Sequence, residues 1–143
     1  MTDWDTYFIN IAEAISKKSK DLECKVGCVI VDGRNRIVAT GYNRFPSKLP
    51  ENNEMWGKSN DTYKNKHSYV IHAEANAIIN RVRDIDNCTL YSTRKPCNEC
   101  TKLIAQMKIS RIVYRDPPTN IKNTDTIADY ILDTLKIKCE QVI

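Results

Sequence analysis

Apolar residues recur every three or four positions near the start of the chain: Trp4, Phe8, Ile11, Ala12 and Ile15. Side chains at this spacing share one face of an α-helix, so residues 3–18 are predicted to form an amphipathic helix. Thr2 or Asp3 is suited to cap it, because a short polar side chain can accept a hydrogen bond from a free amide of the first turn.

The pattern then changes to two apolar runs, at residues 25–31 and 36–42, which predict strands. Residues 32–35 between them read Asp-Gly-Arg-Asn, a composition typical of a tight turn, so the strands should form a hairpin. Residues 47–68 are polar and aperiodic. A loop of about 20 residues in a compact domain is typical of a functional flap. Met55 and Trp56 in this loop either cover a pocket or pin the loop to the surface.

The second half of the chain alternates between helical and extended patterns. Helices are predicted at residues 73–82, 96–107 and 125–135, and strands at residues 89–93, 111–114 and 137–142. The apolar face of the helix at 73–82 should include Val82. That of the helix at 125–135 should consist of Ile127, Ile131, Leu132 and Leu135. The order αββαβαβαβ predicts an α/β protein with three layers, α/β/α, in which helices cover both faces of a mixed five-stranded sheet.

Composition and charge narrow the class of protein. With 143 residues, 41% of them hydrophobic and 28% charged, residues 1–143 are expected to form a single domain. The net charge of +4 comes without a long basic block and suits an anionic small molecule as well as nucleic acid, so the charge alone decides nothing. We expect a small-molecule partner and no nucleic-acid partner. No apolar run reaches membrane-spanning length and no signal peptide is evident, so we expect a cytoplasmic, reducing location and no membrane partner.

The six cysteines do not read as a disulfide framework. Four are isolated or set beside apolar runs, namely Cys24, Cys28, Cys88 and Cys139. Only Cys97 and Cys100 form a close pair, which favours metal binding or redox chemistry.

Two short motifs carry the candidate chemistry: His72-Ala73-Glu74, and Pro96-Cys97 followed by Cys100. Thiolate and imidazole ligands suit zinc better than magnesium or calcium. Three protein ligands leave the fourth position of a zinc ion for water, as in catalytic sites. The order H-x-E and then P-C-x-x-C is the signature of zinc-dependent nucleobase deaminases. In these enzymes the glutamate is the general acid and base, the role expected of Glu74.

With these motifs, the chain resembles the deoxycytidylate (dCMP) deaminases of the cytidine deaminase superfamily over nearly its whole length. The segments that carry the likeness are Lys25-Val26-Gly27, Gly41-Tyr42-Asn43 with Phe45-Pro46, and residues 69–78, 88–91 and 96–104. The resemblance implies a cytidine deaminase-like fold. It also implies hydrolytic deamination of dCMP to dUMP with release of ammonia, which supplies dUMP for thymidylate synthesis.

The resemblance further implies roles for single residues. It places one catalytic Zn²⁺ per subunit on His72, Cys97 and Cys100, and the proton shuttle on Glu74. It gives the Ala73 backbone a contact with the pyrimidine and Asn43 a contact with the deoxyribose hydroxyl. The loop of residues 47–68 has no cysteine, so no second zinc is expected.

The family usually forms a homohexamer that dCTP activates and dTTP inhibits, near a Gly-Tyr-Asn-Gly segment. Here Arg44 replaces the last glycine. We hypothesise that Arg44 alters effector binding or helps accept a triphosphate, so that dCTP is deaminated to dUTP. Lys20 is a second candidate regulatory residue. Arg115, with Ser19, Lys20 and Lys25, is a candidate phosphate contact because these residues flank predicted strand ends.

Two alternatives stay open. The chain could deaminate another cytosine or adenine nucleoside, a free base or RNA, or it could be a non-catalytic zinc module. Glu74 argues against the second, because a structural zinc site does not need it. His67, in the polar loop, is expected to be solvent-exposed and not a metal ligand.

Overall fold

The computed structural model describes residues 3–118 and 122–142. Its helices are α1 (Trp4–Ser16), α2 (Ala73–Ile79), α3 (Asn98–Gln106) and α4 (Thr124–Thr134). Its strands are β1 (Gly27–Val31), β2 (Ile37–Tyr42), β3 (Thr89–Arg94), β4 (Arg111–Asp116) and β5 (Lys138–Gln141). The Asp3 side chain caps α1 by accepting a hydrogen bond from the amide of Thr6 at 2.8 Å. Thr2, the other predicted cap, lies outside the described residues.

The strands form one mixed sheet in the order β2-β1-β3-β4-β5. The strand β1 pairs antiparallel with both β2 and β3, and Cys28 lies opposite Gly41 in the predicted hairpin of β1 and β2. The strands β3, β4 and β5 run parallel, and the helices α3 and α4 make the crossovers between them. The predicted five-stranded mixed sheet and its element order are confirmed.

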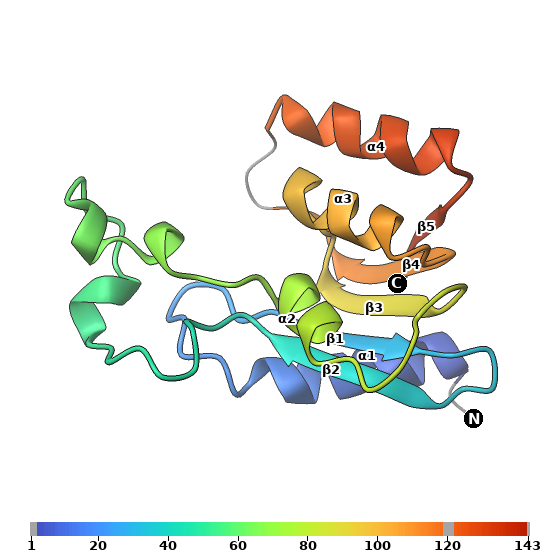
Figure 1. Cartoon of the computed structure of the whole chain (residues 1–143), viewed down its shortest axis with the longest axis horizontal. Helices are drawn as coiled ribbons and strands as arrows, with labels where there is room; N and C mark the ends of the chain where they lie inside the picture. Colours follow the sequence, from blue (N-terminus) through green and yellow to red (C-terminus); the bar gives the residue numbers. More distant parts are fainter. Residues whose placement is uncertain (1–2, 119–121, 143) are drawn as a thin grey trace.

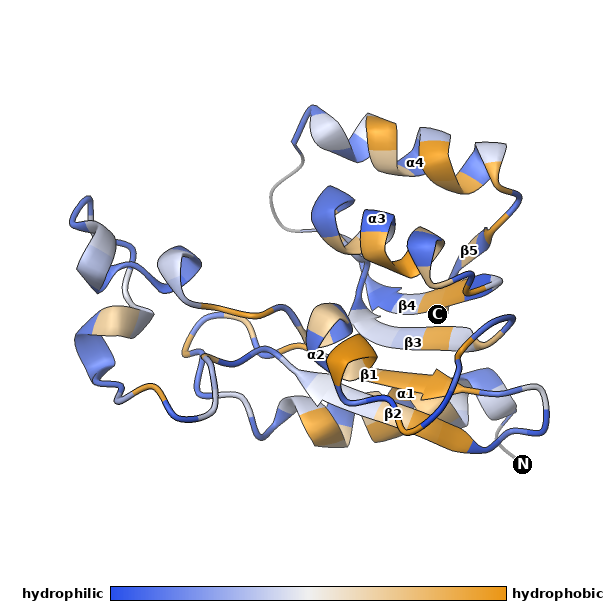
Figure 2. Cartoon of the chain, viewed as in Figure 1, coloured by the Kyte–Doolittle hydropathy of each residue, from blue (hydrophilic) through white to orange (hydrophobic). Residues whose placement is uncertain are grey.

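Helices cover both faces of this sheet, which gives the predicted three layers (Figure 1). The helix α1 packs on one face, where Phe8 and Ala12 meet Val29 and Val113. The helices α2, α3 and α4 lie on the opposite face, over a second buried cluster. Figure 2 shows β1 as a hydrophobic strand, and all five of its residues are buried. This is the pattern of a central strand that is covered on both sides.

Two predicted apolar faces are wrong in part. The helix α2 ends at Ile79, so Val82 lies beyond the helix face that packs on the sheet. Val82 is 82% exposed, and its amide donates to the carbonyl of Val38. In α4, Leu132 is buried but Ile127 and Leu135 are exposed. The reason is that α4 packs mainly on α3 and only slightly on β5, so it buries a narrow stripe.

Residues 47–70, which we call the arm, extend away from the sheet through three short 3-10 turns (Figure 1). The ring of Trp56 stacks on the buried ring of Phe45, with 4.0 Å between their centroids. Met55 is also buried. These contacts support the interpretation in which the two residues pin the loop. Within the described residues, no helix has both the length and the apolar character needed to cross a membrane.

Candidate functional site

The residues of the first motif lie at the start of α2. His72 is the residue that precedes the helix, with an extended backbone, and its side chain makes no capping hydrogen bond. The imidazole is therefore available for another partner. Glu74 lies in the first turn and is only 4% exposed.

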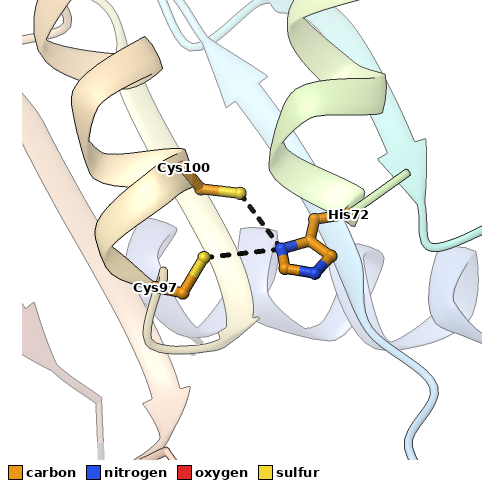
Figure 3. A group of neighbouring side chains, drawn as sticks. All are labelled: His72, Cys97 and Cys100. Atoms are coloured by element: carbon orange, nitrogen blue, oxygen red, sulfur yellow. Dashed lines mark hydrogen bonds between the residues drawn. The ribbon is translucent and has the colours of Figure 1, made fainter. Parts of the chain in front are cut away.

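The residues of the second motif lie at the start of α3. Helix α3 begins at Asn98, two residues later than predicted, so Cys97 occupies the capping position and Cys100 the first turn. The Nδ1 atom of His72 lies 3.4 Å from the Sγ atom of each cysteine, and the three donor atoms all lie within 4.8 Å of one another (Figure 3). Two helix starts far apart in sequence thus present three ligands to one point.

These three residues fit a zinc ion. With Zn–S of about 2.3 Å and Zn–N of about 2.0–2.1 Å, tetrahedral geometry puts nitrogen and sulfur about 3.5 Å apart. The observed 3.4 Å matches that separation. Among the described residues, no other histidine, cysteine or carboxylate joins this cluster. The donor set therefore leaves a fourth position open, which is the pattern of a catalytic site.

The two thiols are electrostatically unequal. A hydrogen bond from Cys100, helped by His72, lowers the pKa of Cys97 to about 3. The same hydrogen bond, together with burial, raises the pKa of Cys100 far above its usual value. The hydrogen bond with Cys97 raises the pKa of His72. A cation that takes both sulfurs as thiolates must displace the shared proton, so metal binding should release acid.

Glu74 lies in surroundings that favour its protonated form. Burial is the main cause that raises the pKa of its carboxyl group. The hydroxyl of Ser92, a fully buried residue of β3, donates to Oε1 of Glu74 at 3.2 Å and holds the carboxylate in place. Sequence reasoning missed Ser92. The one available signal was a polar residue in the middle of an apolar strand.

A cavity of about 470 Å³ opens beside these groups. His72, Ala73, Glu74 and Cys97 line one side of it. Basic side chains from the arm and from the end of β3 line another part, namely Lys58, Lys66, His67, Arg94 and Lys95. Asp21 and Glu23 also line it and pair with Lys66 and Lys58, so the cavity combines an acid and metal ligands with a wall of basic residues, two of which pair with acids of the same wall. His67 is exposed and lies outside the ligand cluster, as expected, yet it lines the cavity.

Of the predicted substrate contacts, Ala73 and Asn43 line the cavity. The Asn43 side chain is buried and already bonded, because Oδ1 accepts from the Val26 amide and Nδ2 donates to the Cys24 carbonyl, both at 2.9 Å. Asn43 therefore shapes the floor of the cavity as well as facing it.

The other tentative residues lie elsewhere. Arg115 does not line the cavity, and its guanidinium pairs with Glu13 at 2.6 Å and with Asp116 at 2.9 Å. Ser19, Lys20 and Lys25 do not line it either. The cationic residues that do line it come from the arm and from the end of β3, and no motif indicated which residues of the arm face the cavity.

The two candidate regulatory residues also lie outside the cavity lining. The Arg44 guanidinium donates to the Phe45 carbonyl at 3.1 Å and to the Tyr42 hydroxyl at 3.2 Å. Lys20 pairs with Glu51 at 3.2 Å. Both contacts lie at the base of the arm.

The geometry defines a zinc-dependent deaminase, since a three-ligand metal site beside a buried carboxyl group lies at two helix starts on a three-layer α/β/α fold. Residues 2–116 match the family described as the cytidine and deoxycytidylate deaminase zinc-binding region. The chain belongs to this family, and its cofactor is Zn²⁺.

Individual relatives agree with this assignment. A "Probable deoxycytidylate deaminase" of Caenorhabditis elegans is 39% identical over 141 residues, which cover 95% of this chain and 68% of the relative. The deoxycytidylate deaminase of Homo sapiens is 31% identical over 150 residues, covering 99% of this chain and 84% of the relative. The crystal structure of the dCMP deaminase of cyanophage S-TIM5 with dCMP and dUMP superposes with a TM-score of 0.78 at 30% identity, covering 96% of this chain and 95% of the phage chain. The predicted cytidine deaminase-like fold is confirmed.

Proposed function

We propose that this chain deaminates dCMP to dUMP and releases ammonia. The similar proteins described above carry the name deoxycytidylate deaminase, and the similar phage structure is described with dCMP and dUMP. The observation that carries the proposal is the composition of the cavity. A buried carboxyl group lies beside three metal ligands on one side, and cationic side chains that suit a phosphate lie on another.

The proposed reaction assigns a separate task to each group. His72, Cys97 and Cys100 would hold Zn²⁺, which would lower the pKa of a water molecule bound beside Glu74. Glu74 accepts one proton from the attacking water and delivers it to the ring nitrogen of cytosine, then takes the second proton from the hydroxyl group now on the ring carbon and passes it to the departing amine. Burial raises the pKa of Glu74, which favours the protonated form that the two deliveries require. The Ala73 backbone and Asn43 line the space for the pyrimidine and the deoxyribose.

The phosphate is proposed to lie against the cationic part of the wall. The residues concerned are Lys58, His67, Arg94 and Lys95, which line the cavity in place of the phosphate contacts suggested by sequence. The two lysines have acidic or aromatic neighbours: Lys58 pairs with Glu23 at 2.8 Å, and Lys95 pairs with Asp129 at 3.0 Å and lies over the Tyr114 ring. These contacts hold the lysines in position at the cavity wall.

A substrate panel tests the proposal. Ammonia release is measured with dCMP, dCTP, CMP and deoxycytidine at equal concentrations, each alone and with added dCTP or dTTP. We expect kcat/KM for dCMP to exceed that for deoxycytidine by at least about 100-fold, because the nucleoside lacks the charged group that the cationic wall would bind. Equal rates for the two would contradict the proposal and favour the alternative of a nucleoside or base deaminase.

Finer properties belong to the same proposal. We propose that residues 1–143 act as one domain, in a homohexamer in the cytoplasm, with dCTP as activator and dTTP as inhibitor. Arg44 supports control at the base of the arm, because its contacts lie there and not in the cavity. The same panel applied to Arg44→Gly separates the two hypotheses for this residue. A selective loss of dCTP deamination would assign Arg44 to substrate choice, and a changed response to dTTP would assign it to regulation.

A further inference from the structure

Three ion pairs fasten the arm to a short segment between α1 and β1. They join Lys20 to Glu51 at 3.2 Å, Asp21 to Lys66 at 2.9 Å and Glu23 to Lys58 at 2.8 Å. The sequence showed only polar residues in both regions. The folded chain brings them together as matched charges beside the cavity.

The middle pair differs from the other two because it is buried. The side chains of Asp21 and Lys66 are 5% and 7% exposed, whereas those of Glu23 and Lys58 are 55% and 51% exposed. Both carboxylate oxygens of Asp21 accept hydrogen bonds from the Lys66 ammonium, at 3.1 Å and 2.9 Å. The exposed pair contributes little on its own, because water competes with it.

Asp21 is also tied to the backbone around it. Its Oδ1 accepts hydrogen bonds from the amides of Glu23 at 2.9 Å and Cys24 at 3.2 Å. Burial alone would raise the pKa of Asp21, but the hydrogen bonds from Lys66 and from these amides outweigh it, and the pKa lies below its usual value. The buried carboxylate therefore stays charged opposite the ammonium group.

The pair connects three parts of the cavity wall. Lys66 belongs to the arm, and its amide donates to the Gly57 carbonyl at 2.8 Å. Asp21 accepts a long hydrogen bond, 3.5 Å, from Nδ2 of Asn43 at the end of β2. Asp21, Lys66 and Asn43 all line the cavity.

Burying two charges costs desolvation energy, and the ion pair itself recovers that cost only with good geometry, so such a pair is weak evidence for stability. A buried pair that joins a long loop to the wall of a cavity has a clearer purpose in fixing position. We propose that Asp21 and Lys66 are positioning residues that hold the arm as a wall of the nucleotide cavity and thereby set the affinity for the nucleotide. The consequence for affinity rests on the function proposed above.

The test compares two lysine variants of the same arm. Lys66→Met removes the buried ammonium and keeps the length of the side chain, and Lys58→Met does the same to the exposed pair. We expect Lys66→Met to raise KM for dCMP at least about tenfold with kcat changed by less than about threefold, because the loss affects binding and not the proton transfers. Lys58 is a proposed phosphate contact, so the KM control is a third variant, Lys64→Met, which removes an exposed arm lysine that pairs with Glu54 at 3.7 Å and does not line the cavity; its KM should stay within about twofold of the wild type.

A variant of Asp21 tests whether Asp21 and Lys66 act as a pair or independently. Asp21→Asn removes the charge but keeps an oxygen for the amides of Glu23 and Cys24. The double variant Asp21→Asn/Lys66→Met should have a KM similar to that of the worse single variant, because the two residues act as one unit. If the effects of the two single variants on KM multiply in the double variant, the proposal is overturned, as it is if KM for Lys66→Met is no higher than that for Lys64→Met. Loss of the folded state in both Lys66→Met and Asp21→Asn would also overturn it, in favour of a general structural role.

Hydrogen–deuterium exchange supplies a readout that needs no substrate. Amides of residues 47–70 should exchange faster in Lys66→Met than in Lys58→Met, while those of the sheet stay unchanged. If the wild type does not deaminate dCMP, the proposed function fails, and this comparison still decides whether the pair holds the arm. Equal exchange of the arm in both variants would overturn the positioning role.

Discussion

The behaviour of the site depends on the surroundings of one carboxyl group. Glu74 is buried beside the metal ligands, and Ser92 holds one of its oxygens through a hydrogen bond of 3.2 Å. Burial raises the pKa of this carboxyl group, which favours its protonated form more than in an exposed glutamate. Its position between metal ligands and cavity determines what it can do, and Ser92 limits how far it can turn.

Replacing this carboxyl group should stop the chemistry and spare the metal. In Glu74→Gln, kcat for dCMP should fall by about 10²- to 10⁴-fold, because an amide cannot carry the proton between water, ring and amine. Zinc content, measured on the purified variant, should stay at one ion per chain. Glu99→Gln is the control, since Glu99 lies in the first turn of α3 but is exposed and pairs with Lys102. Undiminished activity in Glu74→Gln would remove Glu74 from the mechanism.

At the scale of elements, the metal site depends on how closely α2 packs on β2. A Cβ atom added to Gly41 of β2 would lie 2.4 Å from the Ala77 nitrogen and 2.5 Å from the Ala73 carbonyl oxygen. Both are backbone atoms of α2, which cannot move without the helix. Since His72 and Glu74 lie at the start of that helix, the absence of a side chain at Gly41 is part of what places them.

The variant Gly41→Ala should therefore weaken both folding and metal binding. We expect a loss of about 1–3 kcal/mol in the free energy of unfolding, as for other insertions into packed regions, measured by urea denaturation. The zinc content should fall as well, because α2 carries His72 away from the cysteines. Gly33→Ala serves as the control, because a Cβ atom there meets nothing within 4 Å. Equal stability and zinc content in the two variants would show that α2 tolerates the displacement.

The sequence predicted most elements and the metal ligands, and the reasons are local. Short-range periodicity identifies α1 and β1, and the two motifs place His72, Glu74, Cys97 and Cys100 at helix starts. Properties that depend on packing between distant segments could not be predicted from the sequence. Ile127 was predicted to be buried, yet it is exposed because α4 packs mainly on α3 and only slightly on the sheet. The pairing of Lys66 with Asp21 could not be predicted, because the two residues lie 45 positions apart.

At the scale of the whole molecule, one acidic residue joins the outer helix α1 to the central sheet. Asp5 in α1 accepts two hydrogen bonds from Arg111 of β4, at 2.9 Å and 2.6 Å, and one from the Tyr91 hydroxyl of β3 at 2.8 Å. The hydrogen bonds from Arg111 are the main cause that lowers the pKa of Asp5. This contact links the first helix of the chain to two central strands.

The contact predicts how stability depends on pH. Because the folded pKa of Asp5 is lowered, its contribution to stability is complete above the unfolded pKa of about 3.9 and is lost as pH falls through the folded pKa. The melting temperature of Asp5→Asn should lie below that of the wild type at pH 7, and the gap should narrow below about pH 4. Thermal denaturation between pH 7 and pH 2 measures this. If the difference in melting temperature stays constant over that range, the charged form of Asp5 does not stabilise the folded chain as described.

The arm described above lies outside the sheet, whereas the residues that hold the metal lie at the starts of two helices packed on it. Evolution can therefore lengthen, shorten or recharge the arm without disturbing the metal-binding scaffold. Substrate range and reaction chemistry can diverge at different rates in descendants of such a gene, and a new specificity can arise by exchange of a single surface loop.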